Sequence, residues 1–328
     1  MFSRFCTRAP LPARPIFSHS FFTARSAPLP THASLLQRAG LSFRQYATHS
    51  SLPRPRLSTS NSSPSNTTYI TFALSFSALT SYAAFKYDNS SLNLTATVNR
   101  LTGLSLSSQS LTLFALIGTN LVVFAAWQNP ALRARVMPRW FLTSAGSHPV
   151  TLLTSTFSHA EFWHLGLNMV GLYSFGGSMI TAMGAPHFTA FYLSSGVLAS
   201  LISHLFRTSS LRLASASTHT SSLGASGALY SLLALTAYYY PSTSVSLLFV
   251  PFVAFPLKFF MPGLMAMDVA GILGRWGRFD HVAHLGGAVV GFGWAMMGVP
   301  MWLSAKKEVV RRKIKERNER VWRGERWE

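Results

Sequence analysis

Acidic residues are scarce in this chain and absent from its first 87 residues. Nine Asp and Glu stand against 28 Lys and Arg among 328 residues, and the first acidic residue is Asp88. The same N-terminal region carries eight arginines among many serines and has no compact apolar block. Such a segment cannot bury a core, and its composition is typical of a mitochondrial transit peptide. The alternative is a disordered basic linker without a targeting role.

Cysteine is nearly absent as well, because Cys6 is the only one in the chain. It lies in the N-terminal region, so a processed chain would hold neither a disulfide nor a thiolate. Within the same region, the four residues from Arg44 to Ala47 resemble a matrix-processing site, with the arginine three residues before a cut that would follow Tyr46.

The net charge of +19 is concentrated in the N-terminal region and in the tail from Lys306 onward. Nucleic-acid binding is a poor explanation of this charge, because the basic residues are not interleaved with aromatic side chains on a folded domain. We expect the tail to form a charged helix that is solvated or faces lipid headgroups.

Long apolar runs fill most of the remaining chain, although the mean hydropathy is only +0.26. A membrane span needs about 20 mostly apolar residues. The windows of this kind are Tyr69–Phe85, Leu111–Trp127, Phe162–Met183, His187–Phe206, Leu223–Tyr240, Phe255–Leu273 and Val282–Leu303. Proline interrupts the apolar run before the sixth window, so we predict an extended or re-entrant loop over Val245–Phe255.

These windows predict an all-α fold, a polytopic helix bundle in a lipid bilayer. We expect a transit peptide and disordered linker over residues 1–66, followed by one extra transmembrane helix and a linker over residues 67–110. A six-helix core would then occupy residues 111–304, and a basic C-terminal tail residues 305–328.

Two polar residues stand where apolar spans begin: Ser226 within the sequence Gly-Ala-Ser-Gly, and His284 before Leu-Gly-Gly. A serine hydroxyl is a weak nucleophile until a base takes its proton, and neutral imidazole suits that task near neutral pH. The first turn of a helix also offers free backbone amides that favour developing negative charge. The pattern predicts a nucleophile and its base. The alternative for Ser226 is a helix-interface serine that bonds back to its own helix.

Small residues surround both positions. Gly224 and Gly227 flank Ser226, and Gly287 and Gly291 lie four residues apart on the last span, so the two spans could approach closely. Tyr230 is one helical turn after Ser226, on the same face, where its ring is expected to pack on the imidazole of the base.

No acidic residue is expected to complete a triad. Between Phe141 and Leu303 the acids are Glu161, Asp268 and Asp280; Asp280 adjoins a helix start, and the sequence identifies no partner for Asp268. A Ser-His dyad is therefore the simplest arrangement. Two histidines, at positions 281 and 284, could bind a metal, but the sequence places no third ligand near them, so we predict neither a metal nor a cofactor.

A second polar pair begins the span at Phe162–Met183. His164 and Asn168 are four residues apart and face the same way. An amide inside hydrocarbon is costly and usually has a use. We expect both side chains to donate hydrogen bonds to an oxyanion, beside the Ser226 amide.

Together these motifs resemble the rhomboid intramembrane serine proteases, in particular the mitochondrial inner-membrane, presenilin-associated branch. The resemblance covers roughly residues 111–303 and rests on the segments around Ser226 and His284 and on the pair His164 and Asn168, in the family order. It implies that Ser226 is the nucleophile, His284 the base, and His164 and Asn168 the oxyanion donors. The extra helix before the core resembles the mitochondrial arrangement.

The resemblance also implies a function. The chain would cleave single-span membrane proteins of the mitochondrial inner membrane, such as dynamin-like GTPases or imported precursors with sorting anchors. A different class of function stays open: a catalytically silent rhomboid-like protein that binds and escorts membrane helices. A polytopic carrier or channel is disfavoured, because the internal repeats expected of carriers are not evident.

The N-terminal composition predicts a processed chain. Because Arg44 is placed for a cut after Tyr46, we expect the mature N-terminus at Ala47 or a few residues beyond it. N-terminal sequencing of the protein purified from mitochondria measures this directly. An intact Met1 in that preparation would contradict the prediction.

Overall fold

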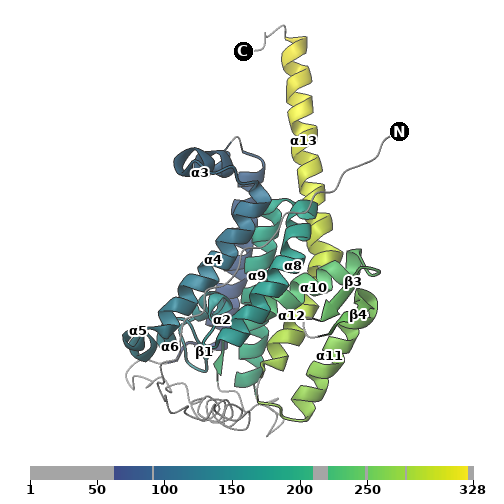
Figure 1. Cartoon of the computed structure of the whole chain (residues 1–328). Coiled ribbons are helices and arrows are strands. Elements are labelled where there is room, and N and C mark those ends of the chain that lie inside the picture. The colour runs from purple at the N-terminus through teal and green to yellow at the C-terminus, as the bar shows by residue number, and fades with distance from the viewer. Residues whose placement is uncertain (1–62, 91, 210–220, 248–249, 278, 324–328) are drawn as a thin grey trace, which may run out of the picture. The chain divides into compact units, whose positions relative to one another are not determined.

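The computed structural model describes residues 63–90, 92–209, 221–247, 250–277 and 279–323. Residues 1–62 of the expected transit peptide and linker, with the site before Ala47, lie outside these ranges. The elements are arranged as a helix bundle (Figure 1). Its helices are α2 (Asn66–Asp88), α3 (Leu94–Thr102), α4 (Ser108–Gln128), α5 (Pro130–Arg135), α6 (Met137–Trp140), α7 (Thr151–Thr154), α8 (Phe162–Met183), α9 (Ala185–Thr208), α10 (Ser226–Tyr239), α11 (Leu257–Leu273), α12 (His281–Gly293) and α13 (Val299–Trp322).

The predicted all-α fold is confirmed, with two small sheets added. Strand β1 (Thr143–Ser144) pairs antiparallel with β2 (Ser221–Ser222), and β3 (Ser244–Leu247) pairs antiparallel with β4 (Val250–Pro256). A short 3-10 turn, η1 (Ser155–Phe157), precedes α8, and a π-helical segment, η2 (Trp294–Gly298), joins α12 to α13. The stretch predicted as an extended or re-entrant loop before α11 is therefore a hairpin.

Each predicted span coincides with helix, although the lengths differ. Three helical stretches among the described residues are long and apolar enough to cross a membrane: Ser108–Gln128, Ala185–Thr208 and His281–Trp322. The last of these continues 19 residues past Leu303, where the predicted span ended, so the basic tail extends the same helix. In contrast, α10 and α11 have only 14 and 17 residues.

Side-chain caps fix where several of these helices begin. Ser65 accepts a hydrogen bond from the Thr68 amide at the start of α2, and Ser107 does the same for Ser110 at the start of α4. Such caps satisfy backbone donors that have no partner within the helix. At the start of α12 the capping residue is Asp280, whose carboxylate accepts from the Ala283 amide.

Helix α10 lies at the centre of the bundle, against α8, α9, α11 and α12. Its Ala228 and Ala234 are fully buried, and Leu232 and Leu235 are almost so. Lipid tails are as apolar as these side chains, so association of the helices depends on close packing and hydrogen bonds rather than on the hydrophobic effect. The contact between α10 and α12 has both. Ser231 donates a hydrogen bond of 2.7 Å to the Gly287 carbonyl, across the two helices.

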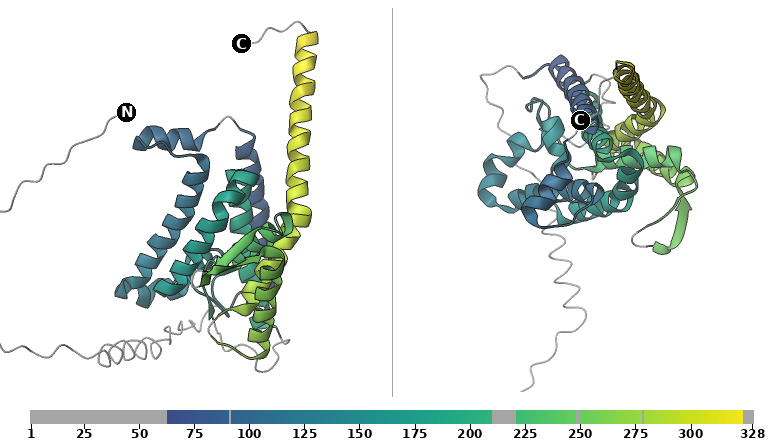
Figure 2. Two further views of the ribbon diagram at one scale, coloured as in Figure 1. Left: turned by 45° about the vertical axis from the view of Figure 1, so that its right-hand side comes forward. Right: turned by 90° about the horizontal axis from the view of Figure 1, so that it is seen from above.

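Helix α2 is the extra helix, and it packs along α9 (Figure 2). Tyr69 is its anchor: the ring stacks on His204 with 3.8 Å between centroids, and the hydroxyl donates to the Ser147 carbonyl. Apolar side chains of α2 and α9, among them Ala73, Val197 and Leu201, form a satellite core around this contact. Tyr69 therefore connects helix α2 to the loop between β1 and α7.

Because α10 and α12 approach closely, alanine substitutions at two glycines of α12 should differ in their effect on stability. A Cβ at Gly287 would lie 2.2 Å from the Gly227 carbonyl oxygen, whereas a Cβ at Gly293 meets nothing within 4 Å. We expect Gly287→Ala to destabilise the protein by about 1–3 kcal/mol through overpacking. The matched control, Gly293→Ala, should be neutral or slightly stabilising. Thermal unfolding in detergent micelles compares the two, and equal melting temperatures would argue against the close contact.

Candidate active site

Ser226 is the first residue of α10, and the chain before it is held from two sides. Strand β2 pairs with β1, and the Gly224 amide donates to the Ser155 carbonyl at 2.8 Å. Gly224 has φ +126°, a conformation that L side chains rarely adopt, and a Cβ there would lie 2.6 Å from the His164 ring. Only glycine fits this position. The turn therefore sets the direction in which α10, and Ser226 with it, begins.

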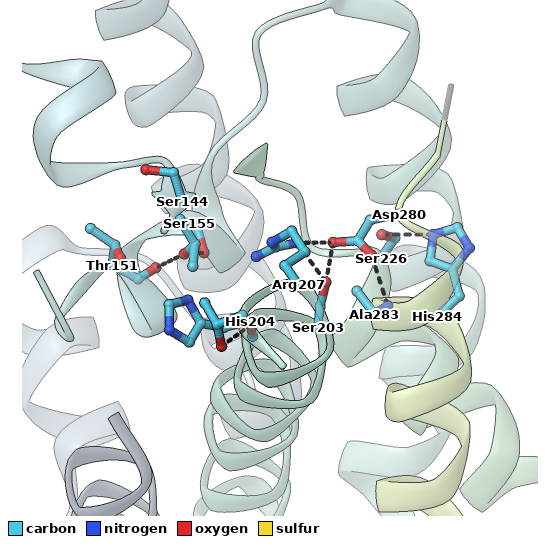
Figure 3. Close-up of polar contacts among 12 residues, drawn as sticks. Ser144, Thr151, Ser155, Ser203, His204, Arg207, Ser226, Asp280, Ala283 and His284 are labelled. Atoms are coloured by element: carbon cyan, nitrogen blue, oxygen red, sulfur yellow. Dashed lines mark hydrogen bonds and ion pairs between the residues drawn. The ribbon is translucent and has the colours of Figure 1, made fainter. Parts of the chain in front are cut away.

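His284 meets Ser226 from the first turn of α12. Its Nε2 lies 3.0 Å from Ser226 Oγ, a hydrogen-bond distance between residues 58 positions apart (Figure 3). The Tyr230 ring stacks on the imidazole, with 4.3 Å between centroids and 10° between planes. This is the packing expected from helical spacing. Gly227, one residue after Ser226, faces Ala199, and a Cβ there would lie 2.7 Å from the Ala199 Cβ, so the glycine gives α9 room beside α10.

Asp268 corrects the expectation that no acid would reach the histidine. Its Oδ1 lies 3.0 Å from His284 Nδ1 and 2.6 Å from His281 Nδ1, and the residue is fully buried on α11. A carboxylate at Nδ1 fixes the tautomer that leaves Nε2 free to accept a proton. Sequence reasoning left Asp268 without a partner because that partner depends on how α11 packs against α12.

His164 lies beside the turn before Ser226, and Asn168 follows it one helical turn later on α8. The His164 ring packs under Gly224, and Asn168 is buried at 4% exposure. The Asn168 Nδ2 group donates to the His164 carbonyl at 2.7 Å, within its own helix. His164 is thus brought to the serine turn, whereas the side-chain amide of Asn168 donates within α8 itself.

His159 is a further residue of this site, which the sequence analysis did not single out. It is fully buried, its Nε2 accepts a hydrogen bond of 3.4 Å from the Ala225 amide, and its ring meets His164 edge to face. Burial, together with the neighbouring His164, lowers the pKa of His159 to about 3, so the ring stays neutral and can accept. The only sequence signal was its position five residues before His164.

A partly buried ion pair fixes the start of α12 against the end of α9. Arg207 Nη1 lies 2.9 Å from Asp280 Oδ2, Ser203 donates to the same oxygen at 2.6 Å, and Oδ1 accepts from the Ala283 amide at 3.0 Å (Figure 3). Although burial raises the pKa of Asp280, the Arg207 charge and these hydrogen bonds lower it to about 2. The carboxylate is therefore ionised at all physiological pH values and holds the helix that carries His284.

The ion pair predicts a specific pH dependence of stability. The pKa of Asp280 is lowered from 3.8 to about 2 in the folded protein. Its contribution to the free energy of unfolding is therefore present at pH values above 3.8 and is lost as the pH falls from 3.8 through 2. Asp280→Asn leaves Arg207 buried beside a neutral group, so we expect a loss of about 3–5 kcal/mol near neutral pH. Thermal unfolding of both proteins should show the gap narrowing below pH 4.

Glu308→Gln is the control for that measurement. Glu308 also pairs with arginines, at 2.7 Å and 2.8 Å, but on the exposed part of α13. Exposed ion pairs contribute little to the free energy of unfolding. This variant should therefore have the melting temperature of the wild type. A constant gap between Asp280→Asn and wild type from pH 6 to pH 3 would show that the ion pair does not hold α12.

The segment that carries these residues is similar to known proteins. Residues 146–301 match the Rhomboid domain. The chain is 37% identical over 185 residues to Rhomboid protein 1, mitochondrial, of Saccharomyces cerevisiae, covering 55% of this chain and 52% of that protein. It is 35% identical over 196 residues to the human Presenilin-associated rhomboid-like protein, mitochondrial, covering 59% and 50%. RHOMBOID-like protein 12, mitochondrial, of Arabidopsis thaliana is 32% identical over 149 residues, 43% and 44% of the two chains. The chain thus spans about half the length of the curated relatives it matches.

Proposed function

Because the chain carries a rhomboid-family domain and is a multi-pass membrane protein with mitochondrial relatives, we propose that it is an intramembrane serine endopeptidase of the mitochondrial inner membrane. One observation carries the proposal. Ser226 and His284 come from different helices, 58 positions apart, and their side chains lie within hydrogen-bond distance. A packing serine would bond to its own helix, as Ser231 does to Gly227 in addition to its contact across the helices.

The proposed reaction is acyl transfer through Ser226. His284 Nε2 takes the proton from Ser226 Oγ as the oxygen attacks the peptide carbonyl, and it returns that proton to the leaving amine. Water then hydrolyses the acyl-enzyme, with His284 again acting as the base. Asp268 acts through His284: it holds the imidazole at Nδ1 and stabilises the positive charge that forms on the ring. Tyr230 restricts the ring from its face.

The developing oxyanion needs donors on the side of Ser226 that faces α8. Ser226 begins α10, so its backbone amide belongs to the first turn, where amides have no acceptor within the helix. We propose that His164 and Asn168 add side-chain donors to this amide. The Asn168 side-chain amide has two N–H donors, so one can stay on the His164 carbonyl while the other turns to the oxyanion as it forms in the transition state.

The proposed substrates are single-span membrane proteins whose anchor helix enters the bundle from the bilayer. Family resemblance suggests dynamin-like GTPases or imported precursors with sorting anchors. The second candidate function is a silent rhomboid-like protein that escorts membrane helices without cutting them. Such a protein does not need an activated serine, so the contact between Ser226 and His284 favours the enzyme.

The protease proposal predicts strict dependence on both residues. Ser226→Ala and His284→Ala should each abolish cleavage of a membrane-anchored substrate in proteoliposomes. The double variant should be no worse than either single variant, because the two groups act as a unit. A fluorophosphonate should label the wild-type serine and fail to label His284→Ala, in which the hydroxyl is not activated.

Ser231→Ala is the matched control for lost folding. Like Ser226 it is a serine of α10, but among the described residues its hydroxyl is found bonded to the Gly227 and Gly287 carbonyls and not to His284. It should lower stability while the folded fraction keeps fluorophosphonate labelling. The proposal would fail if Ser226→Ala protein, inserted at the wild-type level, still cleaved substrate at the wild-type rate.

A further inference from the structure

We propose that Asp268, His281 and His284 form an inhibitory binding site for a divalent cation of the zinc type. Their three donor atoms, one carboxylate oxygen and two imidazole nitrogens, all lie within 4.8 Å of one another. Binding is a property of the site itself, whereas the inhibition rests on the protease function proposed above. The cation would be a regulator and not a cofactor, since no step of the proposed reaction uses it.

The geometry is close to what such a cation requires. Asp268 Oδ1 lies 2.6 Å from His281 Nδ1 and 3.0 Å from His284 Nδ1. Tetrahedral zinc with ligands at about 2.0–2.1 Å separates its donor atoms by roughly 3.4 Å. The carboxylate would need to retreat by less than about 1 Å to admit the ion. Three protein ligands leave a fourth position for water, and mixed nitrogen and oxygen ligands suit zinc better than calcium or magnesium.

The histidines are fixed in the orientation that a cation would use. Both rings turn Nδ1 toward the same carboxylate oxygen, although they lie three residues apart on α12. The His281 ring fills the space beside Gly271, where a Cβ would lie 2.4 Å from Nε2. The His284 ring is held by Tyr230. Among the described residues the ion-pair partners found for Asp268 are these two imidazoles, so its negative charge is available to a cation.

Binding at this site would disable the base without touching Ser226. In the metal-free protein, neutral His284 carries its proton on Nδ1 and accepts the serine proton on Nε2. A cation at Nδ1 moves that single proton to Nε2, where it faces Ser226 Oγ, and the ring can no longer accept. Neutral His281 shifts its proton in the same way. No proton is released, nothing is oxidised, and the local charge rises by two.

The binding test uses tag-free, full-length protein in detergent, stripped with EDTA and titrated with ZnCl₂ in competition with a chromophoric chelator. Ser226→Ala protein should bind one Zn²⁺ per chain as tightly as wild type. Asp268→Asn and His281→Gln are near-isosteric, and each should weaken binding at least tenfold, consistent with the loss of a metal ligand. His148→Gln changes a histidine that lies in the loop before α7, outside the cluster, and should bind as wild type does.

The activity test measures, for each variant, the ratio of cleavage rates with and without Zn²⁺. We expect a wild-type rate that falls with occupancy and recovers on adding EDTA, and a ratio near one for His281→Gln. Absence of stoichiometric binding, or binding that Asp268→Asn and His281→Gln leave unchanged, would overturn the inference. Tight binding at this site in a protein that shows no cleavage even in EDTA would support the metal site and contradict the protease function. Cleavage unaffected by saturating Zn²⁺ would overturn the inhibition and leave the protease proposal standing.

Discussion

The geometry of the candidate site depends on how closely the backbones of α10 and α12 approach each other. Ser226 and His284 both stand in first turns, one on α10 and one on α12, so the distance between their side chains depends on how closely these two helices approach. Helix axes usually lie 8–10 Å apart, depending on the side chains between them. Here Gly287 packs directly on the Gly227 carbonyl, and one turn later Gly291 packs on Ser231. Absent side chains thus set the distance between the proposed nucleophile and its proposed base.

Much of the fold follows from the sequence because apolar windows and helix-breaking residues are local signals. The window Phe162–Met183 has the bounds of α8, and six other windows coincide with helix. Polar residues at the starts of apolar runs also pointed to Ser226 and His284, since such placements are costly without a use. Their face-to-face contact could be anticipated only because glycines mark both helices.

The remaining site residues were beyond sequence reasoning for a shared physical reason. Asp268, His159 and Asp280 each act through a partner on another element, and which partner they meet depends on the register and rotation of packed helices. Hydropathy gives the length of a helix and does not give its rotation about its axis. A buried acid without a basic neighbour in sequence therefore indicates that a partner exists, without naming it. The Arg207 partner of Asp280 lies 73 positions away.

The shortness of α10 has a consequence for the depth of Ser226, the proposed nucleophile, in the membrane. Fourteen residues at 1.5 Å each give a helix of about 21 Å, about 9 Å less than the hydrocarbon thickness of roughly 30 Å. The C-terminal end carries Tyr239 and Tyr240, exposed at 42% and 47%, as aromatic residues at a membrane interface are. With that end at the interface, Ser226 lies below the opposite surface, so local thinning of the bilayer would bring bulk water closer to the serine without any motion of the protein.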